Sequence, residues 1–331
     1  VFDLVAFAIV ILFNATLLPS DRELSHERGD AMGSRLPLLS ALLALTGLSL
    51  LSAGLINAQV SPAAPTSWGL MMAGVVAVAL FARHDTRSPN PLAELGLLRI
   101  PSFAAASLSL LALNLATSGI LFVLPAYVET ALGNSALMGA LMLMPMVIAA
   151  MVGSVITKQI ADGLGKGRAC MGSLILIALG LVVMAASTTL VGYPFMVVGQ
   201  CACGLGMAMG LPVMQGWGME RVLQQQRGGG SALISTFQQL GCLIGIGAIG
   251  SLVGSTYAAS CRGTAAEGFR SVALAFEAAD AQGAPQAEAV RAAASSAYAH
   301  AVLVAFCVAA VALLLSAALT AFGSRAGAGE R

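Results

Sequence analysis

The sequence has few charged and few aromatic side chains for its length. Of its 331 residues, 9% are charged and 5% are aromatic, whereas 58% are apolar. Soluble globular proteins carry about 25% charged residues, so this chain lacks the charge needed to cover a water-exposed surface of its size. The formal net charge of +1 gives no reason to expect a nucleic-acid partner.

Sequence patterns typical of enzymes and metal sites are also missing. The six cysteines have neither metal-ligand spacing nor the arrangement of a disulfide framework, since all but Cys261 lie in or beside apolar runs. The three histidines are scattered along the chain, and the glycines at 228–230 lack the lysine of a phosphate-binding loop. We therefore predict no enzymatic activity, no catalytic residue, no metal and no cofactor.

Long apolar runs are what the sequence has in abundance. They have the length of about 20 residues that crosses a bilayer as a helix, and they lack the two-residue alternation of a barrel strand. Within lipid, a helix pairs all its backbone polar groups internally. We predict an all-α, polytopic transmembrane bundle with nine spans, at about 2–19, 36–58, 67–83, 103–128, 135–157, 169–187, 190–214, 230–255 and 298–322.

The basic residues between these spans indicate an orientation. If the segment after the first span is cytoplasmic, 13 of the 16 Lys and Arg residues fall in cytoplasmic segments. The three others lie in the one long outer loop, 256–297, and long loops follow the positive-inside rule less strictly. This predicts a multi-pass protein of the inner (plasma) membrane with a cytoplasmic tail at 324–331. Within the long loop, 265–280 and 285–297 are predicted to form short helices over the membrane.

Several short motifs occur in order between Pro101 and Gly180. They are an aromatic after serine at the start of a span, an LP-x-Y pattern near its outer end, an LG-x-S turn, and an LMP in the next span. These are Ser102-Phe103, Leu124-Pro125-Ala126-Tyr127, Leu132-Gly133-Asn134-Ser135 and Leu143-Met144-Pro145. Their order resembles the major facilitator superfamily, and its fourteen-span drug:proton antiporter branch in particular. The stretch from Arg227 to Gly241 resembles the family's RG-x-x-[SG] entry to the penultimate span.

The resemblance implies a domain organisation. Residues 1–19 would be the last helix of an N-terminal bundle whose first five helices are absent, and 20–102 would hold cytoplasmic loops and two central linker helices. Residues 103–323 would form the C-terminal six-helix bundle. A start outside the membrane, directly at a span, leads us to expect an N-terminally truncated chain.

The family's cytoplasmic loop signature implies a gating loop. It corresponds here to Gly153 followed by Asp162, Gly165, Lys166 and Arg168. The basic residue that usually follows the aspartate is Gly163 in this chain. We expect Asp162 to lie just before a helix that begins near Arg168, where a carboxylate favours the positive helix N-terminus. An ordinary capped turn is the alternative interpretation.

Candidate substrate-binding residues are polar or aromatic side chains within spans. Ser107, Asn114 and Ser118 lie within about 40° of one another on one helical face. Asn114 is mid-span, where an unpaired amide is costly, so it either faces a wet cavity or bonds a neighbouring helix. The other candidates are Tyr127, Gln200, Gln238 and Gln239. For both Gln238 and Gln239, cavity lining and interhelical bonding remain alternatives.

Proton coupling requires an acid within the membrane. Between 103 and 255 the acids are Glu129, Asp162 and Glu220, all at span edges. Glu129 is therefore the coupling candidate in this part of the chain. The predicted function is proton-coupled efflux of drugs or other small amphipathic compounds; the alternative is a non-transporting remnant or interaction subunit that needs a separate N-terminal half. The predicted partners are lipid, substrate, protons, and such a half or a periplasmic adaptor.

Overall fold

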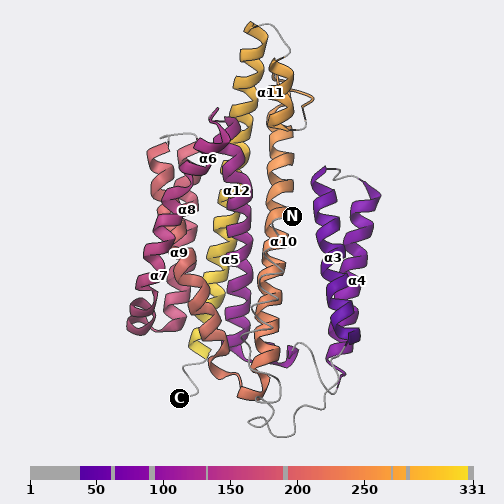
Figure 1. The fold of residues 1–331 in the computed structure, drawn as a ribbon, viewed down its shortest axis with the longest axis vertical. Coiled ribbons are helices and arrows are strands. Elements are labelled where there is room, and N and C mark those ends of the chain that lie inside the picture. Colours follow the sequence, from indigo (N-terminus) through magenta and orange to yellow (C-terminus); the bar gives the residue numbers. More distant parts are fainter. Residues whose placement is uncertain are drawn as a thin grey trace, which may run out of the picture. The chain divides into compact units, whose positions relative to one another are not determined.

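The computed structural model describes residues 38–60, 64–88, 94–131, 133–188, 193–269, 271–280 and 284–326. Throughout these ranges the chain is helical and contains no strand (Figure 1). Eight helices are long and apolar enough to cross a membrane, which confirms the all-α, polytopic fold class. The predicted span 2–19 lies outside the described residues.

The long helices follow the predicted apolar runs. They are α3 (Leu38–Val60), α4 (Pro65–Asp85), α5 (Pro101–Ala126), α7 (Met144–Leu164), α8 (Lys166–Ala186), α9 (Tyr193–Gly218), α10 (Arg227–Ser260) and α12 (Ala284–Ala326). The shorter elements are η1 (Leu95–Arg99), η2 (Tyr127–Ala131), α6 (Ala136–Met142), η4 (Met219–Arg221), η5 (Gln224–Gln226) and α11 (Val272–Asp280). Proline occupies the first turn of α4, α5 and α7, where its missing N–H has no intrahelical partner to lose.

Helices α3 and α4 pack against each other through glycine. A methyl group at Gly47 would lie 2.8 Å from Cγ2 of Val78, and one at Gly54 would lie 2.6 Å from Cγ of Met71. A hydrogen bond of 3.1 Å joins Ser40 Oγ to His84 Nδ1. Small residues allow the close backbone approach on which packing in lipid depends.

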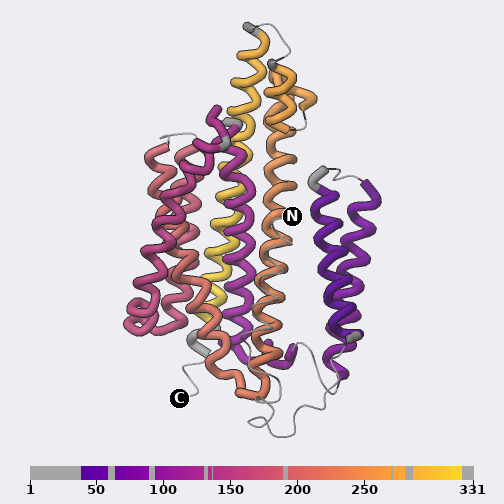
Figure 2. The backbone as a smooth tube through the Cα atoms, viewed as in Figure 1, coloured from indigo at the N-terminus to yellow at the C-terminus, as the bar shows by residue number. Residues whose placement is uncertain are grey.

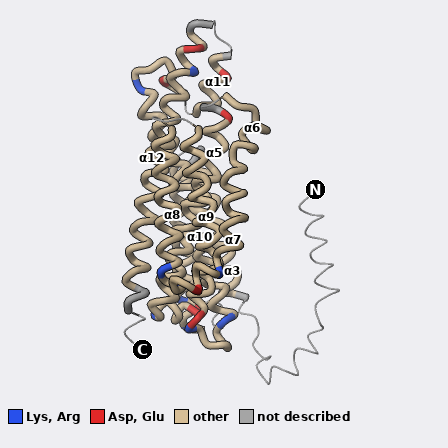
Figure 3. Tube along the Cα trace, turned by 90° about the vertical axis from the view of Figure 1, so that its left-hand side faces the viewer, with Lys and Arg blue, Asp and Glu red and all other residues tan. Residues whose placement is uncertain are grey.

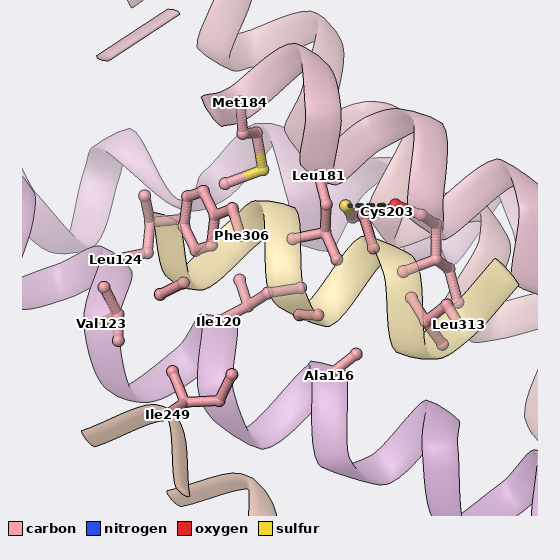
Figure 4. Close-up of a cluster of buried hydrophobic side chains, with 14 of the residues drawn as sticks. Ala116, Ile120, Val123, Leu124, Leu181, Met184, Cys203, Ile249, Phe306 and Leu313 are labelled. Carbon is pink, nitrogen blue, oxygen red and sulfur yellow. Dashed lines mark hydrogen bonds between the residues drawn. The ribbon is translucent and has the colours of Figure 1, made fainter. Parts of the chain in front are cut away.

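The other six long helices form a bundle in which α5 contacts α8, α9, α10 and α12, while α9 packs extensively on α7 and α8 (Figure 2). Ile120 and Leu124 of α5 meet Leu181 of α8 and Phe306 of α12 in the interior (Figure 4). Charged side chains gather toward the two ends of these helices, and the stretch between them carries almost none (Figure 3). This distribution is the one that a hydrocarbon layer requires.

Three predicted elements differ in detail from the structure. The predicted span 135–157 is divided at Leu143 into α6 and α7, because Pro145 has no N–H with which to continue one regular helix. Residues 285–297 are helical, but the prediction of a separate helix is wrong, since these residues form the first turns of α12 and continue into its membrane-spanning part. Helix α11 is shorter than the predicted 265–280, because Gly263 and Gly268 take positive φ in the turn before it.

The N-terminal end of α12 packs against α11. Ala275 and Ala279 of α11 and Val290 and Ala294 of α12 are buried, and the two helices pack together. This apolar contact explains why 284–297 extends α12 instead of lying along a membrane surface: the paired helices bury each other's apolar faces.

Candidate transport site

The three polar residues predicted to share a face of α5 have different environments. Ser107 is fully buried and its Oγ has no hydrogen-bond partner among the described residues. Asn114 is half-buried; its Nδ2 donates to Leu110 O at 2.8 Å, and its Oδ1 accepts a weak bond from Cys242 Sγ of α10 at 3.6 Å. Ser118 Oγ donates to Asn114 O. Asn114 therefore bonds a neighbouring helix, which was one of its two predicted alternatives.

Glycines of α10 permit the contact at Asn114. A methyl group at Gly241 would overlap Leu111 O and lie 3.0 Å from Cβ of Asn114, and one at Gly245 would overlap Leu115 O. Gln238, one turn before Cys242, is half-buried, whereas Gln239 is exposed. We call the contact formed by Asn114, Gly241 and Cys242 the α5–α10 seam. It places an amide and a thiol inside otherwise apolar helices, and Gln238 adds a second amide one turn earlier on α10.

Gln200 of α9 lies inside the bundle. Its side chain is 0% exposed, and neither Oε1 nor Nε2 has a hydrogen-bond partner in the part of the chain that the structure describes. One turn further along, a methyl group at Gly204 would overlap Met146 O of α7. The buried amide thus lies one turn before the close contact of α9 with α7 at Gly204. An unsatisfied buried amide is costly, so this position calls for a physical reason.

Tyr127 and Glu129 lie in η2, a π-helical turn that follows Pro125. Such turns are common at functional sites and arise where the regular backbone bonding is interrupted. Tyr127 is buried at 4% exposure, and Glu129 is half-buried. A methyl group at Gly139 of α6 would lie 3.1 Å from Cγ of Glu129. Because Gly139 has no side chain, the side chain of Glu129 can pack directly against α6.

The predicted gating loop is a single-residue connection. Helix α7 ends at Leu164, Gly165 has φ +81°, and α8 begins at Lys166. As expected, Asp162 precedes a helix that begins near Arg168, since α8 starts at Lys166. Asp162 itself lies in the last turn of α7, however, where the negative end of the helix dipole disfavours a carboxylate. Asp162 and Arg168 are both exposed.

Lys166 has a partner that the motif did not predict. Its Nζ lies 3.5 Å from Oε1 of Glu220 in η4, with side chains 44% and 46% exposed. The pair joins the α7–α8 connection to the segment between α9 and α10. In the sequence, only the position of the charged Glu220 at a span edge indicated this ion pair. A half-exposed pair of this kind contributes little stability.

The candidates therefore fall into separate places: the α5–α10 seam, the buried Gln200, the η2–α6 contact and the α7–α8 connection. No group of three or more His, Cys, Asp or Glu residues arranged to hold a metal occurs within the described ranges. Sequence reasoning missed a buried bond of 2.8 Å between Ser109 Oγ and Thr320 Oγ1, which joins α5 to α12.

Comparisons with known proteins place the sequence among transporters. The sequence profile of the Major Facilitator Superfamily matches residues 5–246. The chain is 26% identical to a probable actinorhodin transporter of Streptomyces coelicolor over 252 residues, which are 73% of this chain and 42% of that protein. It is 28% identical to a multidrug resistance protein B homolog of Mycobacterium tuberculosis, over 71% of this chain and 43% of that protein.

A third relative is the multidrug efflux pump LfrA of Mycolicibacterium smegmatis, at 23% identity over 56% of this chain and 36% of that protein. The matched regions thus span less than half the length of each of these curated relatives.

Proposed function

Because the chain belongs to the Major Facilitator Superfamily, we propose that it takes part in proton-coupled efflux of drugs or other small amphipathic compounds across the plasma membrane. The names of the multidrug relatives support this class of cargo. The chain matches under half of each relative, so we propose that these residues supply the second helical bundle of such a transporter, which an N-terminal half completes. The bias of basic residues supports a cytoplasmic C-terminus.

The α5–α10 seam is the observation that supports substrate binding best. Asn114 lies near the middle of a span, and among the described residues its partner outside α5 is the weakly bonding thiol of Cys242, at 3.6 Å. A thiol is a poor donor, so the amide oxygen can exchange this bond for one to a ligand. Transporter substrates sit near the bilayer midplane between two bundles, and Gln238 supplies a second amide one turn away.

An efflux assay tests this assignment. The chain is co-expressed with an N-terminal half from a multidrug relative in bacteria lacking their own pumps, and ethidium export is followed by fluorescence. We expect export from the pair, and a loss of about tenfold in Asn114→Leu and Gln238→Leu, which corresponds to about 1.4 kcal/mol of binding. Ser251→Ala, on an exposed part of α10, should export normally.

Two results would count against the proposal. Absence of export from a pair in which both halves reach the membrane would favour a non-transporting interaction subunit. Normal export by both leucine variants would remove the α5–α10 seam from the binding site while leaving transport in place.

For proton coupling we propose Glu129. Its half-buried position against Gly139 lets protonation change the contact between η2 and α6. Glu129→Gln should abolish export driven by a proton gradient while leaving ethidium binding intact, because the amide cannot release a proton. Glu277→Gln, at an exposed position of α11, is the matched control. Gradient-driven export by Glu129→Gln at the parent rate would reject this role.

A further inference from the structure

The first turn of helix α10 has a sequence that stabilises a helix poorly. Its first four residues are Arg227, Gly228, Gly229 and Gly230, and the preceding Gln226 forms no side-chain cap. No acidic residue lies in the first turn. Three consecutive glycines disfavour a helix, and uncapped N–H groups at a helix start require partners. A 34-residue helix that carries half of the α5–α10 seam therefore depends on another segment for the placement of its first turn.

That segment is the turn before α5. Glu94 is half-buried, and its Oε2 accepts a hydrogen bond of 3.1 Å from Nε2 of Gln226. A methyl group at Gly229 would overlap Cγ of Glu94 and lie 3.2 Å from its backbone N. The missing side chain at Gly229 thus makes room for Glu94. By contrast, a methyl group at Gly228 would meet nothing within 4 Å.

A second contact lies beside the first. Leu97 of η1 is buried at 3% exposure, and a methyl group at Gly230 would lie 3.1 Å from its Cδ1. Turn η1 runs directly into α5, since Ile100 N bonds Leu97 O and Pro101 is the first residue of α5. The segment 94–99 therefore touches the start of α10 and is continuous with the start of α5, the two helices that form the seam.

We propose that Glu94 is a positioning residue that sets the register of α10 against α5. Its carboxylate complements the positive end of α10, its bond to Gln226 fixes the first turn, and Gly229 admits it. Gln238 and Cys242 lie nine and thirteen residues beyond Gly229 along α10, and the placement of Cys242 opposite Asn114 follows from that register. The inference concerns geometry, and it depends on the proposed function only for its consequence in transport.

Disulfide formation across the seam measures the register directly. Asn114→Cys places a thiol beside the native Cys242, and the other five cysteines are replaced by serine or alanine. Oxidation of the chain in membranes is followed by counting the thiols that remain open to a maleimide. Cross-linking is expected in the parent, because the two side chains are in contact.

A second cysteine pair distinguishes a shift of α10 against α5 from a general loosening of the helix bundle. Ser109→Cys with Thr320→Cys reports the α5–α12 contact, which Glu94 does not touch. In Glu94→Ala and Gly229→Ala we expect the 114–242 pair to cross-link about fivefold more slowly, with the 109–320 pair unchanged. Gly228→Ala makes the same chemical change one residue earlier and should cross-link at the parent rate. Glu94→Gln, which keeps a hydrogen-bond acceptor, should restore part of the loss.

Each outcome decides the proposal. Parent cross-linking in Glu94→Ala, equal effects of Gly228→Ala and Gly229→Ala, or a parallel loss in the 109–320 pair would overturn it. Slower 114–242 cross-linking in a chain that exports no dye would leave the positioning role standing and reject only the transport function.

Discussion

Ser109 of α5 and Thr320 of α12, 211 positions apart in sequence, share a buried hydrogen bond of 2.8 Å. Each hydroxyl also lies within hydrogen-bond distance of a carbonyl oxygen in its own helix: Ser109 Oγ of Ala105 O, and Thr320 Oγ1 of Ser316 O, both at 2.7 Å. Because each hydroxyl has one proton, one of them donates to the other across the helices, and the acceptor donates to its own carbonyl. The pair thus adds an interhelical bond to two helices whose own backbones are already satisfied. In a membrane interior such bonds are among the few specific links between helices.

The energy of this bond can be measured by a double-mutant cycle. Ser109→Ala and Thr320→Val should each lower the unfolding free energy by about 0.5–1.5 kcal/mol, and the double variant should lose less than the sum of the two. Thermal unfolding in detergent gives the values. Additive losses would mean that the two hydroxyls contribute independently of each other.

Gly204 is predicted to be intolerant of any side chain. Gly204→Ala should destabilise the bundle by about 1–3 kcal/mol, because the added methyl group overlaps Met146 O and forces α7 away from α9. Gly216→Ala in the same helix is the matched control, since nothing lies within 4 Å of its added methyl group. Equal unfolding midpoints for the two variants would contradict this close contact.

Gln200→Leu is expected to stabilise the protein. Both amide atoms are buried without partners in the described structure, and removing such groups recovers about 1–3 kcal/mol of desolvation cost. Gln200→Ala should instead destabilise, because it leaves a cavity. Unfolding in detergent distinguishes the two. A less stable Gln200→Leu would show that the amide binds something, with an internal water the simplest partner.

The ion pair between Lys166 and Glu220 should be nearly neutral for stability. Both side chains are about half exposed, so Lys166→Met or Glu220→Gln should change the unfolding free energy by less than about 1 kcal/mol, and the difference should vanish in high salt. A larger, salt-independent loss would indicate a tighter contact than the 3.5 Å separation supports.

Much of the architecture could be predicted without coordinates. Eight of the nine predicted spans correspond to helices of membrane-crossing length, because segment length and apolarity are local properties. The predicted span 135–157 corresponds to one of these eight, interrupted at Leu143 between α6 and α7. The error occurs where helices meet: 285–297 is the start of α12 and not a separate helix, and α11 packs against α12. This could not be inferred from the segment alone, since it depends on a neighbouring helix.

The candidate site shows the same division. Helical periodicity correctly placed Ser107, Asn114 and Ser118 near one angle on α5, but the angle carries no information on what faces them. In the structure Ser107 is buried, Asn114 bonds Cys242 of α10, and Ser118 donates to the backbone oxygen of Asn114 in its own helix. Asp162 lies at the end of α7 and not at the start of α8 for a related reason: the glycine at 165 lets α7 run further and α8 start earlier than the motif suggested.

The sequence by itself determined that this chain is a helical membrane protein, because few charges and long apolar runs without strand alternation leave helices to satisfy the backbone polar groups in lipid. The transporter family was implied by the resemblance of its ordered motifs. Only the tertiary structure decided which helices touch. Contacts such as Glu94 with Gly229, Ser109 with Thr320 and Gly204 with Met146 join residues from different segments. They depend on close approach between backbones, which composition and periodicity do not encode.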